Sequence, residues 1–344
     1  MFRIHPRVAL ASVVWLAAGA ALPAQQAAPP TNRVTIRVEG DWRFITANGW
    51  PDHAPGAFPR RGNPNTPRPQ SYTFRVPVRP QAAPAPAQRG GWFFGVALNG
   101  VPFEPGTAET WNGNPDWRYE AATGFLNLGL DEHNAHVQPT GAYHYHALPV
   151  GLVARLGGDT NRMLLVAWAA DGFPVYTAMG HQEAKDARSP IRRLRSSYRL
   201  KTAERPGAPE GPGGRPDGRF TQDFEYAPGS GDLDECNGRF GVTPEFPGGT
   251  YYYCITGEFP FLPRRWRGEP DPSFGKGGGP AGRGGPPTPA VVDALDLNRD
   301  GVLDAGELAR APESLRTLDL DGDGRLAPEE FRPPPPRGGG RPGR

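Results

Sequence analysis

The chain has 344 residues, with 38 Lys and Arg against 36 Asp and Glu, which gives a formal net charge of +2. A balanced charge with scattered basic residues lacks the clustered basic surface that nucleic-acid binding requires, so we expect no nucleic-acid partner. The 47 glycines and 43 prolines together exceed a quarter of the chain. They concentrate in tracts that predict long loops and linkers rather than a uniformly disordered protein.

The first 24 residues predict a signal peptide. Two arginines precede an apolar run over residues 8–22, and small residues follow, with a cleavage site after Ala21 or Ala24. This order is typical of secretory signals, although a buried N-terminal helix is the alternative. No later stretch has the ~20 apolar residues that a membrane span requires. We therefore expect a secreted protein, periplasmic or extracellular, without a transmembrane segment.

The next part, residues 32–274, is predicted to be mostly β. Short segments rich in β-branched and aromatic residues predict strands at 34–38, 71–78, 92–98 and 164–170. No amphipathic helical pattern longer than about two turns precedes residue 288. We expect an antiparallel β-rich domain with long loops, a Gly/Pro linker at 275–288, and a disordered tail at 333–344.

Three stretches of this domain stand out, namely LDEHNAHVQPTGAYHYHALP (130–149), AADGFPVY (169–176) and LDECNGRFGVTPEFPGGTYYYCITGEFPF (233–261). Together they resemble the YHYH domain family, which takes its name from the tetrapeptide at 143–146. The resemblance extends over residues from about 90 to 272. It implies a secreted, β-rich domain and no particular activity.

The first and third stretches contain an internal repeat. LDEHNAH and GAYHYH align with LDECNGR and GTYYYC at identical spacing, so that His133 aligns with Cys236 and His146 with Cys254. An exported protein with only two cysteines most simply forms one disulfide. We therefore predict a Cys236–Cys254 disulfide, with Cα atoms within about 7 Å. By symmetry, we expect His133 and His146 to be neighbours with their rings on one side.

Four of the seven histidines, at positions 133, 136, 144 and 146, lie within fourteen residues. His144 and His146 alternate along a predicted strand and should share a face, while His133 and His136 could close the set. Imidazole is a ligand for zinc, copper, iron and nickel. The second copy keeps its tyrosines without any histidine, which indicates that the fold does not need the histidines. We predict that His133, His136, His144 and His146 bind one copper or zinc ion.

Several alternatives stay open at this stage. The histidines and tyrosines could form a hydrogen-bonded network without an ion. Asp171, in an Asp-Gly pair, is either a carboxylate ligand or a turn residue. The cluster could serve a secreted metalloenzyme or oxidase, although the sequence has no G-x-S-x-G or H-E-x-x-H motif. Trp111 and Trp117 could instead stack on sugars in a carbohydrate- or surface-binding module. Protein and carbohydrate partners remain unknown.

Residues 289–332 predict an EF-hand pair. DLNRDGVLDAGE (296–307) and DLDGDGRLAPEE (319–330) both fit D-x-[DN]-x-[DN]-G-x5-E. Calcium takes oxygen ligands at fixed positions of such loops, with a glycine at the sixth position for the sharp turn. The predicted ligands are Asp296, Asn298, Asp300, Val302 through its carbonyl, Asp304 through a water, and Glu307, then Asp319, Asp321, Asp323, Arg325 through its carbonyl, and Glu330.

We therefore expect two bound calcium ions. The loops begin only 23 residues apart, a spacing similar to that of dockerin-like repeats. Short helices should flank them, including one over 289–295 and one opened by Pro312. Outside the cell, calcium is abundant enough to keep sites of about 10⁻⁴ to 10⁻³ M affinity largely filled, which favours a structural role over a switch.

Overall fold

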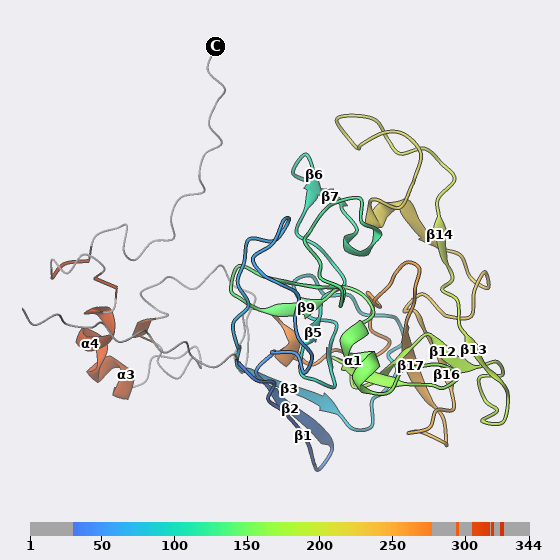
Figure 1. Ribbon diagram of the computed structural model, residues 1–344, viewed down its shortest axis with the longest axis horizontal. Helices are drawn as coiled ribbons and strands as arrows, with labels where there is room; N and C mark the ends of the chain where they lie inside the picture. The colour runs from blue at the N-terminus through green and yellow to red at the C-terminus, as the bar shows by residue number, and fades with distance from the viewer. Residues whose placement is uncertain (1–29, 277–293, 296–304, 317, 320–323, 327–344) are drawn as a thin grey trace, which may run out of the picture. The chain divides into compact units, whose positions relative to one another are not determined.

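The computed structural model describes residues 30–276, 294–295, 305–316, 318–319 and 324–326 (Figure 1). Its strands are β1 (Val34–Glu39), β2 (Trp42–Ala47), β3 (Tyr72–Pro77), β4 (Gly95–Ala97), β5 (Pro102–Phe103), β6 (Thr110–Trp111), β7 (Asn114–Arg118), β8 (Ala135–Val137), β9 (Tyr143–Tyr145), β10 (Leu165–Ala169), β11 (Pro174–Thr177), β12 (Met179–His181), β13 (Ile191–Arg193), β14 (Tyr198–Leu200), β15 (Phe224–Tyr226), β16 (Gly238–Gly241) and β17 (Thr250–Ile255). Its helical segments are η1 (Ala121–Thr123), α1 (Val150–Arg155), η2 (Thr221–Asp223), η3 (Pro272–Phe274), α3 (Ala305–Ala309) and α4 (Ala311–Arg316). The prediction of a mostly β fold is confirmed.

The main sheet has eight strands in the order β16-β17-β11-β10-β4-β5-β9-β8. Its pairs are antiparallel except β5–β9 and β11–β17, which are parallel. All four segments predicted as strands contain one, although the segment 92–98 is extended only over Gly95–Ala97. Smaller sheets are formed by β1-β2-β3, β6-β7, β12-β13 and β14-β15.

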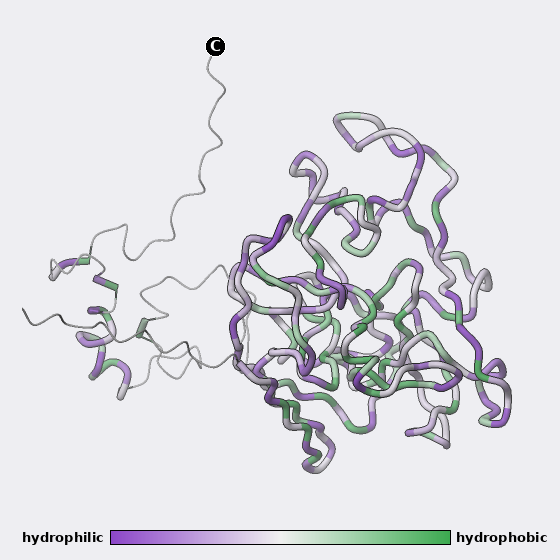
Figure 2. The backbone as a smooth tube through the Cα atoms, in the orientation of Figure 1, coloured by the Kyte–Doolittle hydropathy of each residue, from purple (hydrophilic) through white to green (hydrophobic). Residues whose placement is uncertain are grey.

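The hydrophobic core joins the main sheet to the three-stranded sheet. Ile45 and Phe74 of the smaller sheet belong to the same buried cluster as Val96 and Val166 of the larger one. Phe74 also stacks on Phe274, with ring centroids 4.5 Å apart. Hydrophobic residues follow the strands of the sheets, whereas the long loop between β14 and β15 is largely hydrophilic (Figure 2). The Gly/Pro tracts at 80–91 and 205–219 lie in loops, as expected.

The internal repeat forms two equivalent hairpins at opposite ends of the main sheet. In β8–β9, His136 pairs with His144, and in β16–β17 the aligned Arg239 pairs with Tyr252. The residue before each hairpin's first strand is an asparagine in the left-handed region, Asn134 at φ 60° and Asn237 at φ 56°. The two copies therefore share register and turn conformation.

A carboxylate organises each turn in the same way. Asp131 Oδ1 accepts backbone N–H groups from His133 and Ala135, and its Oδ2 accepts the Tyr143 hydroxyl at 2.7 Å. In the second copy, Asp234 Oδ1 accepts the N–H groups of Cys236 and Gly238, and its carboxylate accepts the Tyr251 hydroxyl. Because these backbone donors point inward at the turn, the carboxylate satisfies groups that burial would otherwise leave unpaired.

The predicted disulfide is wrong, since Cys236 and Cys254 are both free, buried thiols. Side chains alternate between the two faces of a strand. Cys236 packs in the main core cluster with Tyr251 and Tyr253, whereas Cys254 packs with Tyr252 in a second cluster. The thiols thus lie on opposite faces of β17. Burial raises the pKa of each thiol to about 12, which keeps both protonated.

The C-terminal part is described in short pieces, including α3 and α4. Among the described residues, no helix is long and apolar enough to cross a membrane. Pro312 lies in the first turn of α4, where a missing N–H costs nothing. Of the predicted calcium ligands, Asp296, Asn298, Asp300, Val302, Asp304, Asp321, Asp323 and Glu330 lie outside the described residues.

Three predicted ligands of calcium can be placed: Glu307, Asp319 and Arg325. Glu307 lies in α3 and is buried, with 2% of its surface exposed. Asp319 Oδ2 accepts the backbone N–H of Gly324 at 2.9 Å, and Gly324 has φ +80°. The left-handed conformation of Gly324 agrees with the sharp turn predicted at the sixth position of the loop.

Candidate metal centre

Three of the four predicted histidines converge on one face of the β8–β9 hairpin. His144 and the residue two positions later, His146, share a face because strand side chains alternate. His136 pairs directly with His144 across the hairpin and so joins them on that face. The three ring centroids are each 4.7 Å from the other two.

The convergent atoms are the Nε2 nitrogens. His146 Nε2 lies 3.0 Å from His144 Nε2 and 3.1 Å from His136 Nε2. One ligand atom from each of the three residues lies within 4.8 Å of the other two. Nitrogens bound tetrahedrally to a zinc ion at 2.0–2.1 Å are separated by about 3.3 Å. The spacing of the three imidazoles therefore fits a shared metal ion.

The hydrogen bonds of the outer ring nitrogens assign the tautomers. His136 Nδ1 lies 2.8 Å from the Leu128 carbonyl, and His144 Nδ1 lies 3.2 Å from the Ala142 carbonyl. Because a carbonyl oxygen only accepts, both Nδ1 atoms carry the hydrogen, and both Nε2 atoms present lone pairs. Metal-binding histidines usually donate their second nitrogen to such an oxygen.

His146 cannot satisfy this arrangement by hydrogen bonding. If its Nε2 carries the hydrogen, it can donate to the Nε2 of either His136 or His144, and the lone pair of the other then has no donor. Its Nδ1 is buried and has no hydrogen-bond partner among the described residues. Either tautomer of His146 thus leaves a buried polar atom unsatisfied, which costs about 1–3 kcal/mol. A cation between the three Nε2 atoms removes the opposition of their lone pairs.

Burial keeps the cluster in the neutral form that metal binding needs. His144 and His146 are 1% and 3% exposed, and His136 is partly buried. Burial lowers the pKa of His136, and it lowers the pKa of His144 to about 3. It also lowers the pKa of His146 well below its usual value, with His144 and His136 adding to the effect.

His133 does not join the cluster, contrary to our expectation that it would neighbour His146. Its Nε2 contacts the Ala54 carbonyl at 3.0 Å, and its ring lies 3.9 Å from that of His53. His53 in turn contacts the Tyr145 hydroxyl at 2.7 Å, so His133 belongs to the tyrosine face of the hairpin. His133 and His146 lie on opposite faces of their hairpin, as the aligned Cys236 and Cys254 do in the second copy.

Two further predicted candidates have structural roles. Asp171 is buried in the tight turn between β10 and β11, where Gly172 has φ +91°. Its carboxylate accepts the Tyr253 hydroxyl at 2.5 Å and the Gly268 N–H at 2.9 Å, so the turn interpretation holds. Trp117 is 9% exposed and donates its indole N–H to the Glu210 carbonyl, which makes it a loop anchor.

Sequence reasoning missed Glu104, the carboxylate beside the cluster. Its Oε2 lies 3.5 Å from His144 Nε2, although it is forty positions away in the chain. It follows the two-residue strand β5, which is too short to show any periodicity. His53 was missed for a similar reason, because it lies in a loop far from the histidine motif.

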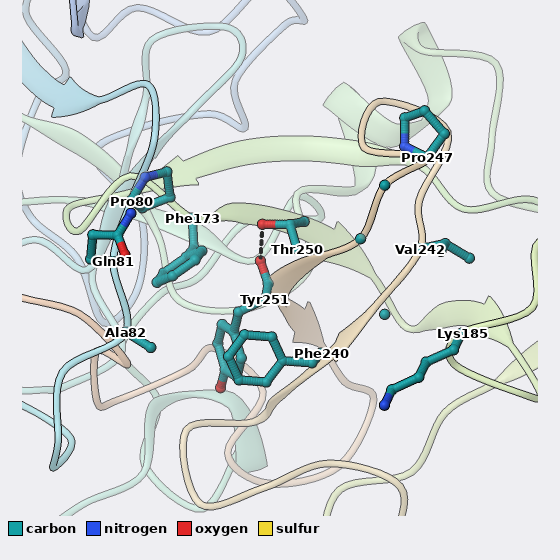
Figure 3. A pocket seen from close by; sticks show the side chains of 13 residues that line it. Pro80, Gln81, Ala82, Phe173, Lys185, Phe240, Val242, Pro247, Thr250 and Tyr251 are labelled. Carbon is teal, nitrogen blue, oxygen red and sulfur yellow. Dashed lines mark hydrogen bonds between the residues drawn. The ribbon is translucent and has the colours of Figure 1, made fainter.

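A surface pocket lies beside β16 and β17, at the other end of the sheet (Figure 3). Phe240 is 52% exposed there and packs edge-on against Tyr251, with ring centroids 5.1 Å apart. Phe173 and Lys185 also line the pocket. Among the described residues that line it, none is a histidine, a carboxylate or a cysteine. The lining residues therefore include no side chain of the kinds that usually bind a metal ion.

The fold and the site define a β-rich protein with a buried three-histidine cluster and a C-terminal EF-hand pair. A family model described as YHYH protein matches residues 73–268, and a second, described as EF hand, matches residues 293–311 and 313–332. The first match covers more than half of the chain, so the chain belongs to the YHYH protein family. Neither a curated protein nor a solved structure matches it.

Proposed function

We propose that this chain is an exported metal-binding protein that holds one copper or zinc ion at His136, His144 and His146 and two calcium ions in its EF-hand loops. The observation that carries the first part is the convergence of three Nε2 atoms, two of which present lone pairs because the Nδ1 atoms of His136 and His144 donate to backbone carbonyls. Three neutral imidazoles are a recurrent ligand set for zinc and are suited to copper.

Titration of chelator-treated protein with zinc or copper ions tests this site. We expect one ion to bind per chain, with the affinity largely lost in a His144→Ala/His146→Ala variant. His133→Ala is the matched control, since His133 lies on the opposite face of the hairpin and should leave the affinity unchanged. Equal affinity of the double variant and the wild-type protein would place the ion elsewhere or exclude it.

The calcium sites are supported by the EF-hand matches and by the Gly324–Asp319 hydrogen bond at the start of the second loop. Export is supported by the leader-like pattern of residues 1–24. If the leader is cleaved, the exported protein begins at Leu22 or Gln25, which N-terminal sequencing can determine. An intact Met1 on exported protein would contradict cleavage.

A further inference from the structure

The outer edge of β1 is left open by the fold. β1 lies at the edge of the three-stranded sheet β1-β2-β3, and no strand among the described residues pairs with its outer side. The Asn48 N–H donates to the Arg33 carbonyl, so these two residues form a hydrogen-bonded pair. Because such pairs alternate along an antiparallel ladder, the N–H and C=O groups of Val34, Ile36 and Val38 point away from β2.

The apolar face of the sheet continues into β1 beyond the core. Ile36 pairs with the buried Ile45 of β2. Val38 pairs with Arg43, which pairs in turn with the buried Val76 of β3. Residues directly opposite each other share a face, so Ile36 and Val38 lie on the face that packs on the core. They are nevertheless 39% and 56% exposed, which leaves an apolar strip along the open edge.

β1 lacks the features that usually prevent an edge strand from pairing. Its register with β2 is continuous, without a bulge, and it contains no proline. Its two charged residues, Arg37 and Glu39, form an exposed ion pair with each other. A Cβ added at Gly40, in the turn to β2, would meet no atom within 4 Å, so the tip of the hairpin is unobstructed (Figure 1).

The opposite edge of the same sheet is closed. Arg75 of β3 donates its backbone N–H to Ser273 Oγ in η3, and its guanidinium pairs with Asp271 at 3.0 Å. With one open edge, such a sheet can join a second copy of itself in a closed two-fold pair, whereas two open edges would allow a fibre.

We propose that β1 pairs with β1 of a second copy of this chain in an antiparallel, two-fold symmetric dimer centred on Ile36. Val34 of each copy then lies opposite Val38 of the other, and their outward N–H and C=O groups face each other. Arg33 lies opposite Glu39 of the second copy, so opposite charges meet at both ends of the shared ladder. The dimer does not depend on the proposed metal sites, because β1 contributes no residue to them.

Other registers fit the strand less well. The outward backbone groups must face each other, so the centre can only move to a neighbouring residue. A centre at Arg37 would place that residue opposite its own copy, and a centre at Thr35 would place Arg33 opposite Arg37, which brings like charges together. A centre at Val38 would pair the strand with the turn at Gly40 and leave its first residues without partners.

Sedimentation analysis of the full chain over a wide range of concentration tests the dimer. We expect the wild-type protein to dimerise as its concentration rises. Val38→Lys places a charge on the apolar strip and should be monomeric where the wild-type protein is dimeric. Val38→Pro removes an N–H that β2 does not use and should have the same effect. Val150→Lys is the control, because Val150 is 43% exposed in α1, and it should dimerise like the wild-type protein.

Two charge reversals test the register. Arg33→Glu and Glu39→Arg each bring like charges together across the ladder, so each variant alone should dimerise more weakly than the wild-type protein. An equal mixture of the two restores both pairs of opposite charges and should form a heterodimer.

Circular dichroism checks that each variant folds. Wild-type protein that stays monomeric at every concentration overturns the proposal, and so does a dimer that persists in the folded Val38 variants. A mixture of the charge reversals that dimerises no better than either variant alone overturns the register centred on Ile36.

Discussion

The buried polar side chains of this domain include some whose hydrogen bonds are satisfied by the fold and others whose hydrogen bonds are not. Asp131 and Asp234 accept backbone and tyrosine donors that surround them, so the fold accounts for their presence. His146 has a buried nitrogen without any such partner among the described residues. On the opposite side of the ring, its Nε2 faces the inward lone pairs of His136 and His144, and a bound cation would remove that opposition.

The buried carboxyl of Asp171 should impose a pH dependence on stability. Burial raises its pKa from 3.8 to about 6, although the Tyr253 hydroxyl and three backbone N–H groups oppose this shift. Because the folded state then holds the proton more tightly than the unfolded state, the contribution of this group to the free energy of unfolding falls as pH rises from about 4 to about 6. The full change corresponds to about 3 kcal/mol.

Chemical denaturation of wild-type and Asp171→Asn protein between these pH values measures the effect. The wild-type protein should lose stability relative to the variant as pH rises. A stability difference that does not vary with pH would show that the carboxyl titrates at its ordinary value in the folded protein.

The hairpins illustrate what the sequence could and could not predict. The aligned blocks predicted an internal repeat, and the two copies form hairpins with the same strand register. They also placed His144 and His146 on one face. The same blocks led to two wrong predictions, that Cys236 neighbours Cys254 and that His133 neighbours His146. In each copy the first residue lies on the opposite face of the hairpin from the second. Alignment across a turn gives equivalence between copies, not proximity within one.

The equivalent turn carboxylates provide a matched pair of substitutions. Asp234→Ala leaves two backbone N–H groups and the Tyr251 hydroxyl without an acceptor. Asp131→Ala leaves three backbone N–H groups, including that of Gly56, and the Tyr143 hydroxyl. Each substitution should therefore lower the free energy of unfolding by about 1–3 kcal/mol. Only Asp131 supports the hairpin that carries the histidines. Zinc affinity should therefore fall in Asp131→Ala and remain unchanged in Asp234→Ala. Equal zinc affinity in both folded variants would contradict the dependence of the site on its hairpin.

The EF-hand loops should fill independently of the histidines. Glu307 and Glu330 occupy the twelfth loop position, which supplies both carboxylate oxygens to calcium. Glu307→Gln and Glu330→Gln should each remove one calcium ion from the full chain at millimolar calcium. Glu313→Gln, an exposed substitution in α4, is the control and should retain both ions. Full calcium occupancy in both loop variants would argue against the predicted ligands.

At the level of the whole chain, the sequence predicted the mostly β body and the EF-hand pair more fully than it predicted the site. Loop-separated strands and calcium loops have local patterns of spacing and residue type. Glu104, in contrast, reaches the histidines through the parallel pairing of β5 and β9. A contact between segments forty residues apart depends on strand order, which no local pattern encodes. For the same reason, the exposed aromatic pocket beside β16 was not predicted.

The metal content of the protein purified without chelator tests the central claim most directly. Elemental analysis should find one copper or zinc ion per chain, in addition to calcium. In the His144→Ala/His146→Ala variant the transition metal should be absent, while calcium stays at the wild-type level. Wild-type protein with no copper or zinc, or a double variant with the wild-type amount, would contradict the three-histidine metal centre.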